Sequence, residues 1–205
     1  MFGLLIRGLV AACFMAAVLP NAAAAASGAT PSAVVENFHH SLLATMKSAD
    51  ELKVRGRYQK LEPEVEGAFN LPFMIQIAAG TKWRSATDDE KAKLIAAFKR
   101  VSVGTYASRF NGFSGERFET LSERDGPGGA KMVYTRIVRP NKEPVPITYV
   151  TRKFGDTWRV YDVIVSGGIS ELAVRRSEYN AILNDSGPGG LIARLNQKAD
   201  QMLTP

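Results

Sequence analysis

Cysteine and histidine are scarce in this 205-residue chain, which contains one cysteine and two histidines. The single cysteine, Cys13, excludes both a disulfide within the chain and a cysteine-rich zinc site. The two histidines, His39 and His40, are adjacent on a predicted helix, where successive side chains point about 100° apart. They cannot converge on one metal ion, so we interpret one as a rim residue and the other as a surface residue. We expect neither a metal nor a cofactor.

Long hydrophobic runs are equally scarce, apart from one short stretch near the N-terminus. Residues 8–19 form an apolar run of twelve residues behind Arg7. This run is too short to cross a bilayer of about 30 Å at about 1.5 Å per residue. A positive charge, a short apolar run and small residues are typical of a secretory signal peptide, so we predict one at residues 1–26, cleaved near Ala24–Ala26. An uncleaved anchor, or a lipoprotein modified at Cys13, fits less well.

Export changes the charge and the redox chemistry of the predicted single domain, residues 27–205. Removing residues 1–26 leaves 179 residues and lowers the net charge from +6 to +5, because Arg7 is lost. It also removes the only thiol, which suits an oxidising compartment such as the bacterial periplasm. There we expect no nucleic-acid partner, and the basic balance favours anionic lipid headgroups or an acidic protein surface.

Sequence motifs of the common enzyme classes are missing. The glycine clusters at 126–129 and 187–190 lack the Lys-Ser or Lys-Thr that completes a phosphate-binding loop. No G-x-S-x-G segment, which marks a nucleophile elbow, occurs in the chain. Both histidines lie on the first predicted helix, so a Ser-His-Asp triad is not easily assembled.

One polar residue stands out, because Asp162 lies within an otherwise apolar predicted strand. A buried carboxylate needs a partner or acquires a raised pKa. As a functional group, Asp162 would be a general base, with Tyr149 or Tyr161 as hydrogen-bond donor. As a structural group, it would pair with Arg136, with Arg175 or with backbone N–H groups at the next helix. We favour the structural interpretation.

Hydrophobic periodicity divides the chain into helices, then strands, then helices. Apolar residues at every third or fourth position predict helices from about Pro31, from Asp50 through Tyr58, from Pro63, between Asn70 and Gly80, and from Thr87 to about Phe110. Four β-rich runs joined by short turns predict an antiparallel meander at 116–124, 131–139, 146–154 and 157–165. Helices return after Ser170, with a break at 186–190. The predicted fold class is α+β, with N-terminal helices, a four-stranded antiparallel sheet and C-terminal helices.

Large apolar side chains are numerous for a single small core. Close packing within that core would absorb them, and this is the simpler interpretation from composition alone. Alternatively, the helices stand off from the sheet and enclose an apolar pocket. An exported, basic domain with such a pocket and without catalytic groups would suit carrying a lipid.

A series of short motifs runs from the second predicted helix to the last: Arg57-Tyr58-x-x-Leu61-x-Pro63, Phe69-x-Leu71-Pro72, Gly80-x-x-Trp83, Tyr106-Ala-x-x-Phe110, Trp158-Arg-Val-Tyr-Asp162-Val, Gly168-Ile-Ser170 and Arg175-x-x-x-Tyr179. No single motif is specific, but their order and spacing resemble the MlaC/toluene-tolerance family over residues 31–203. The Arg-Tyr-Gln-Lys-Leu run and the early Leu-Leu-Ala-Thr-Met-Lys helix most resemble its hopanoid-associated HpnM branch.

This resemblance implies a periplasmic lipid carrier, not an enzyme, that shuttles phospholipid or hopanoid between the inner and outer membranes without covalent chemistry. The implied partners are an inner-membrane lipid transport complex, to which it would be an auxiliary of an ABC transporter, and an outer-membrane acceptor, with transient membrane contact. The alternatives are a protein–protein adaptor with a fully packed core, and a small periplasmic isomerase or hydrolase that uses Asp162. We expect acyl or polycyclic chains to contact ten residues on the predicted helix faces and strands: Phe73, Ile77, Trp83, Phe98, Val101, Tyr106, Val133, Tyr149, Tyr161 and Val163.

Overall fold

A computed structural model describes residues 29–165 and 167–204, so the predicted signal peptide at residues 1–26 lies outside the described residues. The helices within the described part are α1 (Pro31–Lys47), α2 (Ala49–Ala68), α3 (Leu71–Ala79), α4 (Thr81–Ser85), α5 (Asp88–Arg109) and α6 (Glu171–Leu203). Between α5 and α6 lie β1 (Arg117–Asp125), the short 3-10 helix η1 (Pro127–Gly129), β2 (Lys131–Arg139), β3 (Lys142–Phe154), β4 (Thr157–Val165) and β5 (Ile169–Ser170). The order of elements confirms the predicted α+β class.

The strands form one antiparallel sheet in the order β1-β2-β3-β4-β5. The sheet has one strand more than predicted, because the chain turns back after β4 and Ile169 pairs with Val165. Gly167 and Gly168 make this reversal. Their φ angles are 85° and 76°, which residues with a Cβ atom rarely adopt. A strand of two residues is too short for alternation of apolar and polar residues to reveal it.

Polar side chains cap the helices at the predicted starts. The Thr87 hydroxyl accepts a hydrogen bond from the Glu90 N–H at 3.2 Å, and the Glu90 carboxylate accepts one from the Thr87 N–H at 2.8 Å. This reciprocal pair opens α5 and satisfies two N–H groups that lack partners within the helix. The Asn70 side chain accepts from the Phe73 N–H at 3.0 Å and opens α3 in the same way.

Helices α2 and α6 each contain one break. In α2 the break lies at Lys53, with a φ of 51°, and the helix continues through Pro63. The prediction that a new helix starts at Pro63 is therefore wrong: Leu61 and Val65 are both fully buried, so packing on either side of the proline maintains the helix. In α6 the break lies at Gly187, with a φ of 65°, where the sequence predicts it.

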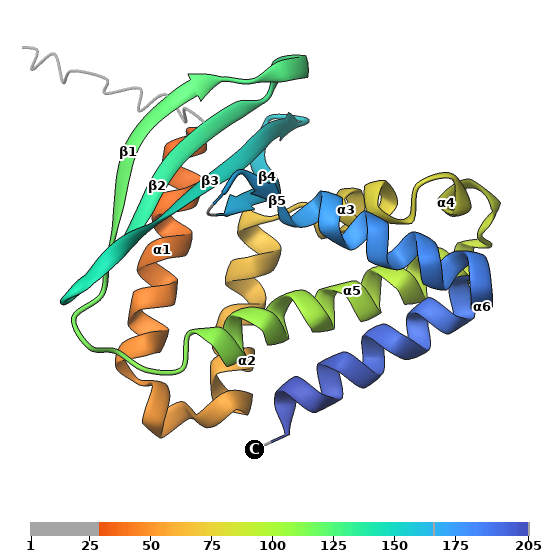
Figure 1. Ribbon diagram of the computed structural model, residues 1–205, viewed down its shortest axis with the longest axis horizontal. Helices are drawn as coiled ribbons and strands as arrows, with labels where there is room; N and C mark the ends of the chain where they lie inside the picture. The colour runs from red at the N-terminus through yellow and green to blue at the C-terminus, as the bar shows by residue number, and fades with distance from the viewer. Residues whose placement is uncertain (1–28, 166, 205) are drawn as a thin grey trace, which may run out of the picture.

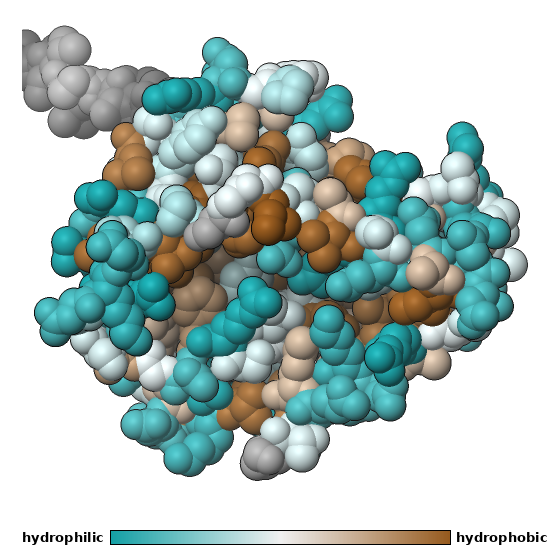
Figure 2. Space-filling model, viewed as in Figure 1, coloured by the Kyte–Doolittle hydropathy of each residue, from teal (hydrophilic) through white to brown (hydrophobic). Residues whose placement is uncertain are grey.

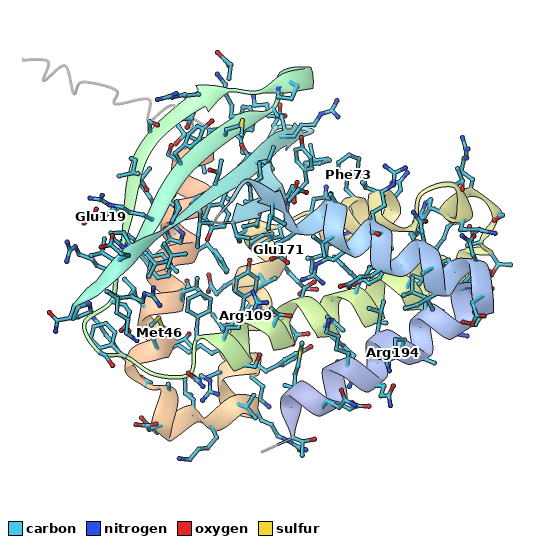
Figure 3. All side chains as sticks on the ribbon, in the orientation of Figure 1. Met46, Phe73, Arg109, Glu119, Glu171 and Arg194 are labelled. Carbon is cyan, nitrogen blue, oxygen red and sulfur yellow. The ribbon has the colours of Figure 1, made fainter. Side chains whose placement is uncertain are left out.

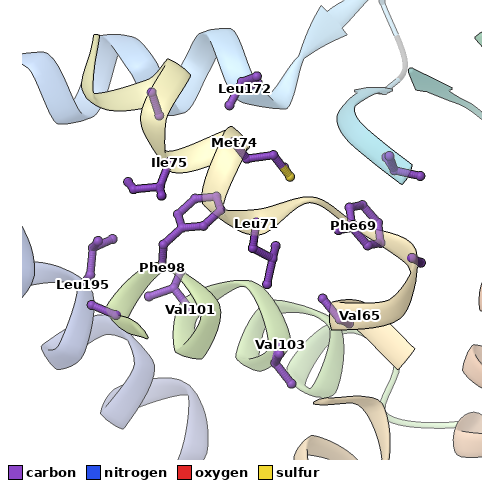
Figure 4. Packing of buried hydrophobic residues seen from close by; sticks show 14 of the residues in the cluster. Val65, Phe69, Leu71, Met74, Ile75, Phe98, Val101, Val103, Leu172 and Leu195 are labelled. Carbon is purple, nitrogen blue, oxygen red and sulfur yellow. The ribbon is translucent and has the colours of Figure 1, made fainter. Parts of the chain in front are cut away.

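The helices lie on one side of the curved sheet, and α6 doubles back at its break so that its second half runs beside α5 (Figure 1). The hydrophobic core continues from the inner face of the sheet through α1, α2 and α3 to α5 and α6. Its inner part, between α3 and α5, is seen in Figure 4. Within residues 29–165 and 167–204, no helix has the length and apolar character needed to span a membrane.

Candidate functional site

An apolar cavity of about 260 Å³ lies between the sheet and the helices. Its sheet wall consists of Ile137, Val145, Ile147, Tyr149, Val163 and Val165. Its helix wall includes Val65, Leu71, Met74, Tyr106 and Phe110, together with Phe69 after the end of α2. Figure 2 shows a recess in this face of the molecule, with hydrophobic atoms inside it and hydrophilic atoms around it. The predicted apolar pocket is therefore present.

Strand alternation explains how three strands build one wall. Val145, Ile147 and Tyr149 occupy alternate positions on β3, so their side chains point to the same face of the sheet. Ile137 on β2 pairs directly with Val145, and Val163 on β4 pairs directly with Tyr149. Directly opposed residues share a face, so the wall extends across β2, β3 and β4.

Arg57 on α2 holds the end of α5 that borders the cavity. Its Nε donates to the Ala107 carbonyl at 2.8 Å, and its Nη1 donates to the Ala49 carbonyl at 2.9 Å. Arg57 is buried, with 8% of its surface exposed. The last carbonyls of a helix lack partners within the helix and favour a nearby cation. Arg57 therefore fixes the last turns of α5, which place Tyr106 against the cavity.

A buried hydrogen bond backs the sheet wall. His39 Nε2 on α1 lies 3.0 Å from the Tyr149 hydroxyl, and the imidazole stacks on Phe118 with ring centroids 4.2 Å apart. Burial, with a smaller contribution from His40, lowers the pKa of His39 to about 3. Burial also raises the pKa of Tyr149 well above its usual value. Both groups are neutral near pH 7. His39 is a core residue rather than the predicted rim residue, whereas His40 is exposed, as the prediction of one surface histidine requires.

Three charged side chains line the same cavity: Arg109 on α5, and Glu171 and Arg175 on α6. Arg109 is exposed, so the cavity reaches solvent beside it, and Figure 3 shows Arg109 and Glu171 at the space between the sheet and α5. The Arg175 guanidinium lies 5.5 Å from the centre of the Phe98 ring and donates to the Tyr179 hydroxyl at 3.4 Å. Burial opposes this charge, but Tyr179 and Glu171 hold the pKa of Arg175 above its usual value.

Asp162 joins β4 to the start of α6. Its carboxylate accepts three hydrogen bonds, from the Val163 N–H at 2.8 Å, the Leu172 N–H at 3.0 Å and the Ser170 hydroxyl at 2.6 Å. The expected pairing with N–H groups of the next helix is therefore found. Among the described residues, neither Arg136 nor Arg175 bonds to this carboxylate. Both oxygens of Asp162 are engaged in holding the backbone, which gives the general-base interpretation no support.

The ten residues predicted to contact lipid fall into separate places. Tyr106, Tyr149 and Val163 line the cavity. Phe98, Val101 and Val133 are fully buried in the core and are not part of the cavity walls. Figure 4 shows Phe98 and Val101 on α5, beside Ile75 of α3 and Leu195 of α6. Helix and strand periodicity marks a buried face without indicating whether that face packs closely or borders a cavity.

The remaining four predicted residues lie outside the cavity walls. Phe73, Ile77 and Trp83 line a separate surface groove beside α3 and α4, which Arg176 of α6 also borders. Tyr161 packs against Phe73 with ring centroids 5.7 Å apart. Figure 3 shows Phe73 on α3, apart from Arg109 and Glu171. Lipid contact at these four residues stays a prediction.

A β-bulge explains the position of Tyr161. Val150 on β3 pairs with Asp162, but the next residue, Thr151, pairs with Val160. Tyr161 is thus an extra residue in β4 and reverses the alternation at this point. The sequence places Tyr161 and Val163 on one face because they are two residues apart, whereas only Val163 reaches the cavity.

Sequence reasoning missed most of the sheet wall and all of the charged residues. Ile147 and Tyr149 lie two residues apart in the predicted strand 146–154, so alternation was sufficient to find Ile147, whereas Val145 precedes that predicted strand. Arg109, Glu171 and Arg175 carry no comparable signal, because many helix residues of this chain are charged. Their common location depends on where the end of α5 and the start of α6 meet the sheet.

Comparison with known proteins gives three similarities. The family model described as MlaC protein matches residues 36–197. The intermembrane phospholipid transport system binding protein MlaC of Haemophilus influenzae is 25% identical over 136 residues, which cover 64% of this chain and 63% of that protein. A solved structure of a phospholipid-binding protein from Ralstonia solanacearum, in complex with a phospholipid, has the same fold, with a TM-score of 0.74 at 22% identity. That similarity covers 84% of this chain and 98% of the solved chain.

Proposed function

Because this chain belongs to the MlaC family, we propose that it is a periplasmic lipid carrier that shuttles phospholipid or hopanoid between the inner and outer membranes. The observation that carries the proposal is the apolar cavity, whose walls reach solvent beside the exposed Arg109. An amphiphile matches this arrangement, with its apolar part between sheet and helices and its polar end at the charged residues. The phospholipid named for both compared proteins supports the same class of ligand.

The energetics favour a carrier that loads and unloads without chemistry. Each buried CH₂ group is worth about 0.8 kcal/mol relative to water, so the cavity walls shield a lipid chain from water effectively. A bilayer interior is as apolar as these walls, so transfer between membrane and cavity is close to balanced. Reversible exchange with two membranes then requires neither a covalent step nor a nucleotide on the carrier.

The cavity volume implies that lipid entry moves its walls. A volume of about 260 Å³ falls just below the roughly 300–1,000 Å³ of pockets for drug-sized ligands. A lipid with two acyl chains is larger than such ligands, so the sheet and helices must separate further when it enters. Apolar contacts between them are non-directional, which allows this separation without breaking a hydrogen-bonded ladder.

Location and partners follow from the sequence features. We propose that residues 1–26 direct export to the periplasm and that the mature chain docks on an inner-membrane lipid transport complex and an outer-membrane acceptor. The net charge of +5 after cleavage at residue 26 would strengthen encounters with acidic surfaces of either.

The adaptor alternative requires a fully packed core, and the enzyme alternative requires a free carboxylate at Asp162. The cavity and the three hydrogen bonds to Asp162 favour neither.

The test is native mass spectrometry of protein purified from the periplasm without detergent, followed by organic extraction of the bound material. We expect one bound mass, which extraction identifies as a phospholipid or a hopanoid and thereby chooses between the two. Protein that remains ligand-free when vesicles of both lipids are offered in excess would contradict the proposal. A turnover product of an offered ester would instead favour the enzyme alternative.

A further inference from the structure

The charged residues of the cavity are not paired with one another. Within residues 29–165 and 167–204, no ion pair of 4.0 Å or less includes Arg109, Glu171 or Arg175. All three nevertheless line one cavity, whose other walls are mainly apolar, with Ser102 and Thr105 as further polar residues. Charge beside an apolar cavity loses hydration and is costly unless a partner compensates for it. The cavity therefore contains positive groups that still have capacity to bind.

Arg175 is held in place while most of its donors remain free. Its guanidinium sits 5.5 Å from the centre of the Phe98 ring and makes one long hydrogen bond of 3.4 Å to Tyr179. An arginine has five N–H donors in a planar fork, which fits two oxygens of a phosphate or carboxylate. Only one of these donors is engaged in the described part of the chain. The fork is thus oriented by its neighbours and available to a ligand.

Arg109 provides a second guanidinium at the same cavity. It lies in the last turn of α5, two residues beyond the Ala107 carbonyl that Arg57 holds at 2.8 Å. Both arginines and Glu171 act electrostatically on the Tyr106 hydroxyl. Burial raises the pKa of Tyr106, the two arginines lower it and Glu171 raises it further. The three charged side chains thus line the same cavity as Tyr106 and act on its hydroxyl.

Helix dipoles explain part of this arrangement but not all of it. A cation in the last turn of α5 and an anion in the first turn of α6 are each favourable, which accounts for Arg109 and Glu171 as helix-end residues. Arg175 lies one turn further into α6 and gains nothing from that dipole. Its charge interaction with Glu171 and its hydrogen bond to Tyr179, each four residues away on α6, stabilise the helix but leave most of its N–H donors free.

We propose, on the basis of the lipid-carrier function above, that Arg109 and Arg175 together bind the phosphodiester of a phospholipid headgroup at the mouth of the cavity. Two guanidinium groups bind a phosphate through charge-assisted hydrogen bonds, while the acyl chains occupy the apolar walls. With Glu171, the three side chains carry a net charge of +1, which matches a singly charged phosphodiester. A hopanoid without phosphate would leave both arginines without an anionic partner.

A competition between lipids with identical chains tests this assignment. Delipidated protein is incubated with vesicles containing equal amounts of dioleoyl phosphatidylethanolamine and dioleoylglycerol, with a neutral triterpenoid alcohol as a third competitor. The protein is then re-isolated and its bound lipid is quantified by mass spectrometry. We expect the wild type to enrich the phospholipid by about tenfold or more over each neutral lipid, as loss of charge-assisted bonds would predict.

Variants locate the preference. R109Q/R175Q should lose about tenfold of the enrichment while still binding lipid, because its apolar walls are unchanged. R109Q alone should lose part of the enrichment. Because Arg109 is exposed, this variant leaves the Arg175 contacts to Phe98 and Tyr179 in place and separates the loss of charge from their disturbance. R176Q is the matched control, because Arg176 is exposed and borders the separate groove beside α3.

Each outcome decides the proposal. Equal binding of phospholipid and dioleoylglycerol by the wild type, or preference for the triterpenoid, would overturn the phosphate site and leave the carrier function intact. An unchanged enrichment in R109Q/R175Q, or a loss in R176Q as large as in R109Q/R175Q, would also overturn the site. Binding of none of the three lipids by the wild type would overturn the carrier function and this inference with it.

Discussion

His39 of α1 and Tyr149 of β3 share a buried hydrogen bond of 3.0 Å, so the first helix is joined directly to the residue that forms the middle of the cavity wall. Both side chains are neutral near pH 7, since burial lowers the pKa of His39 to about 3 and raises that of Tyr149. The His39–Tyr149 pair behind the sheet wall is thus hydrogen-bonded but carries no charge. This arrangement suits a surface that must contact hydrocarbon.

The pKa of His39 predicts how stability depends on pH. In the folded chain it is about 3, below its usual 6.5, so between these values the unfolded chain binds more protons. The contribution of neutral, buried His39 to the free energy of unfolding is therefore fully present above pH 6.5. It is lost as the pH falls toward 3, by up to about 1.4 kcal/mol per pH unit. We expect His39→Gln to flatten this dependence, measured by urea unfolding at pH 4, 5 and 7. Parallel curves for both proteins would contradict the assignment.

A larger side chain in the cavity should displace lipid. We expect Ile147→Trp to reduce co-purified lipid by about tenfold, because excluding two methylenes already costs about 1.6 kcal/mol. The control is Ile77→Trp, which changes the same residue type at an equally half-buried position in the groove beside α3. Extraction and mass spectrometry measure both. Loss of lipid in Ile77→Trp alone would favour the contacts predicted from sequence over the cavity described here.

Asp162 is expected to act on stability. Asp162→Asn replaces the carboxylate that accepts three hydrogen bonds with a neutral amide. We expect these bonds to weaken and the free energy of unfolding to fall by about 1–3 kcal/mol. Asp156→Asn, at an exposed turn before β4, should leave stability unchanged. Chemical denaturation of both variants measures the difference. Full stability of Asp162→Asn would mean that β4 and α6 are held together by other contacts.

Arg57 should be needed for the position of the α5 end. Arg57→Met removes the two N–H groups that donate to the Ala107 and Ala49 carbonyls. We therefore expect the free energy of unfolding to fall by about 2–4 kcal/mol. Arg55→Met, on the same helix but exposed, is the matched control. Thermal unfolding compares the two. Equal melting temperatures for Arg57→Met and the wild type would show that α5 does not depend on this contact.

Local signals predicted most elements, because each depends on neighbouring residues. The capping pair of Thr87 and Glu90 starts α5, and alternation within β3 gives its inward face. The site was harder to predict, since two of its determinants are not local. The bulge at Tyr161 depends on pairing with β3, and the convergence of Arg109 with Arg175 depends on how two distant helices pack.

The three hydrogen bonds to Asp162 also bear on the kinetics of lipid exchange. They hold the start of α6, with Glu171 and Leu172, to the last residues of β4, so we expect this corner of the cavity to open least readily. Beyond the Arg57 contact at Ala107, the exposed residues 111–115 that follow Phe110 form another border, which has no comparable clamp among the described hydrogen bonds. We therefore expect the residence time of a bound lipid to be governed by the opening of that border.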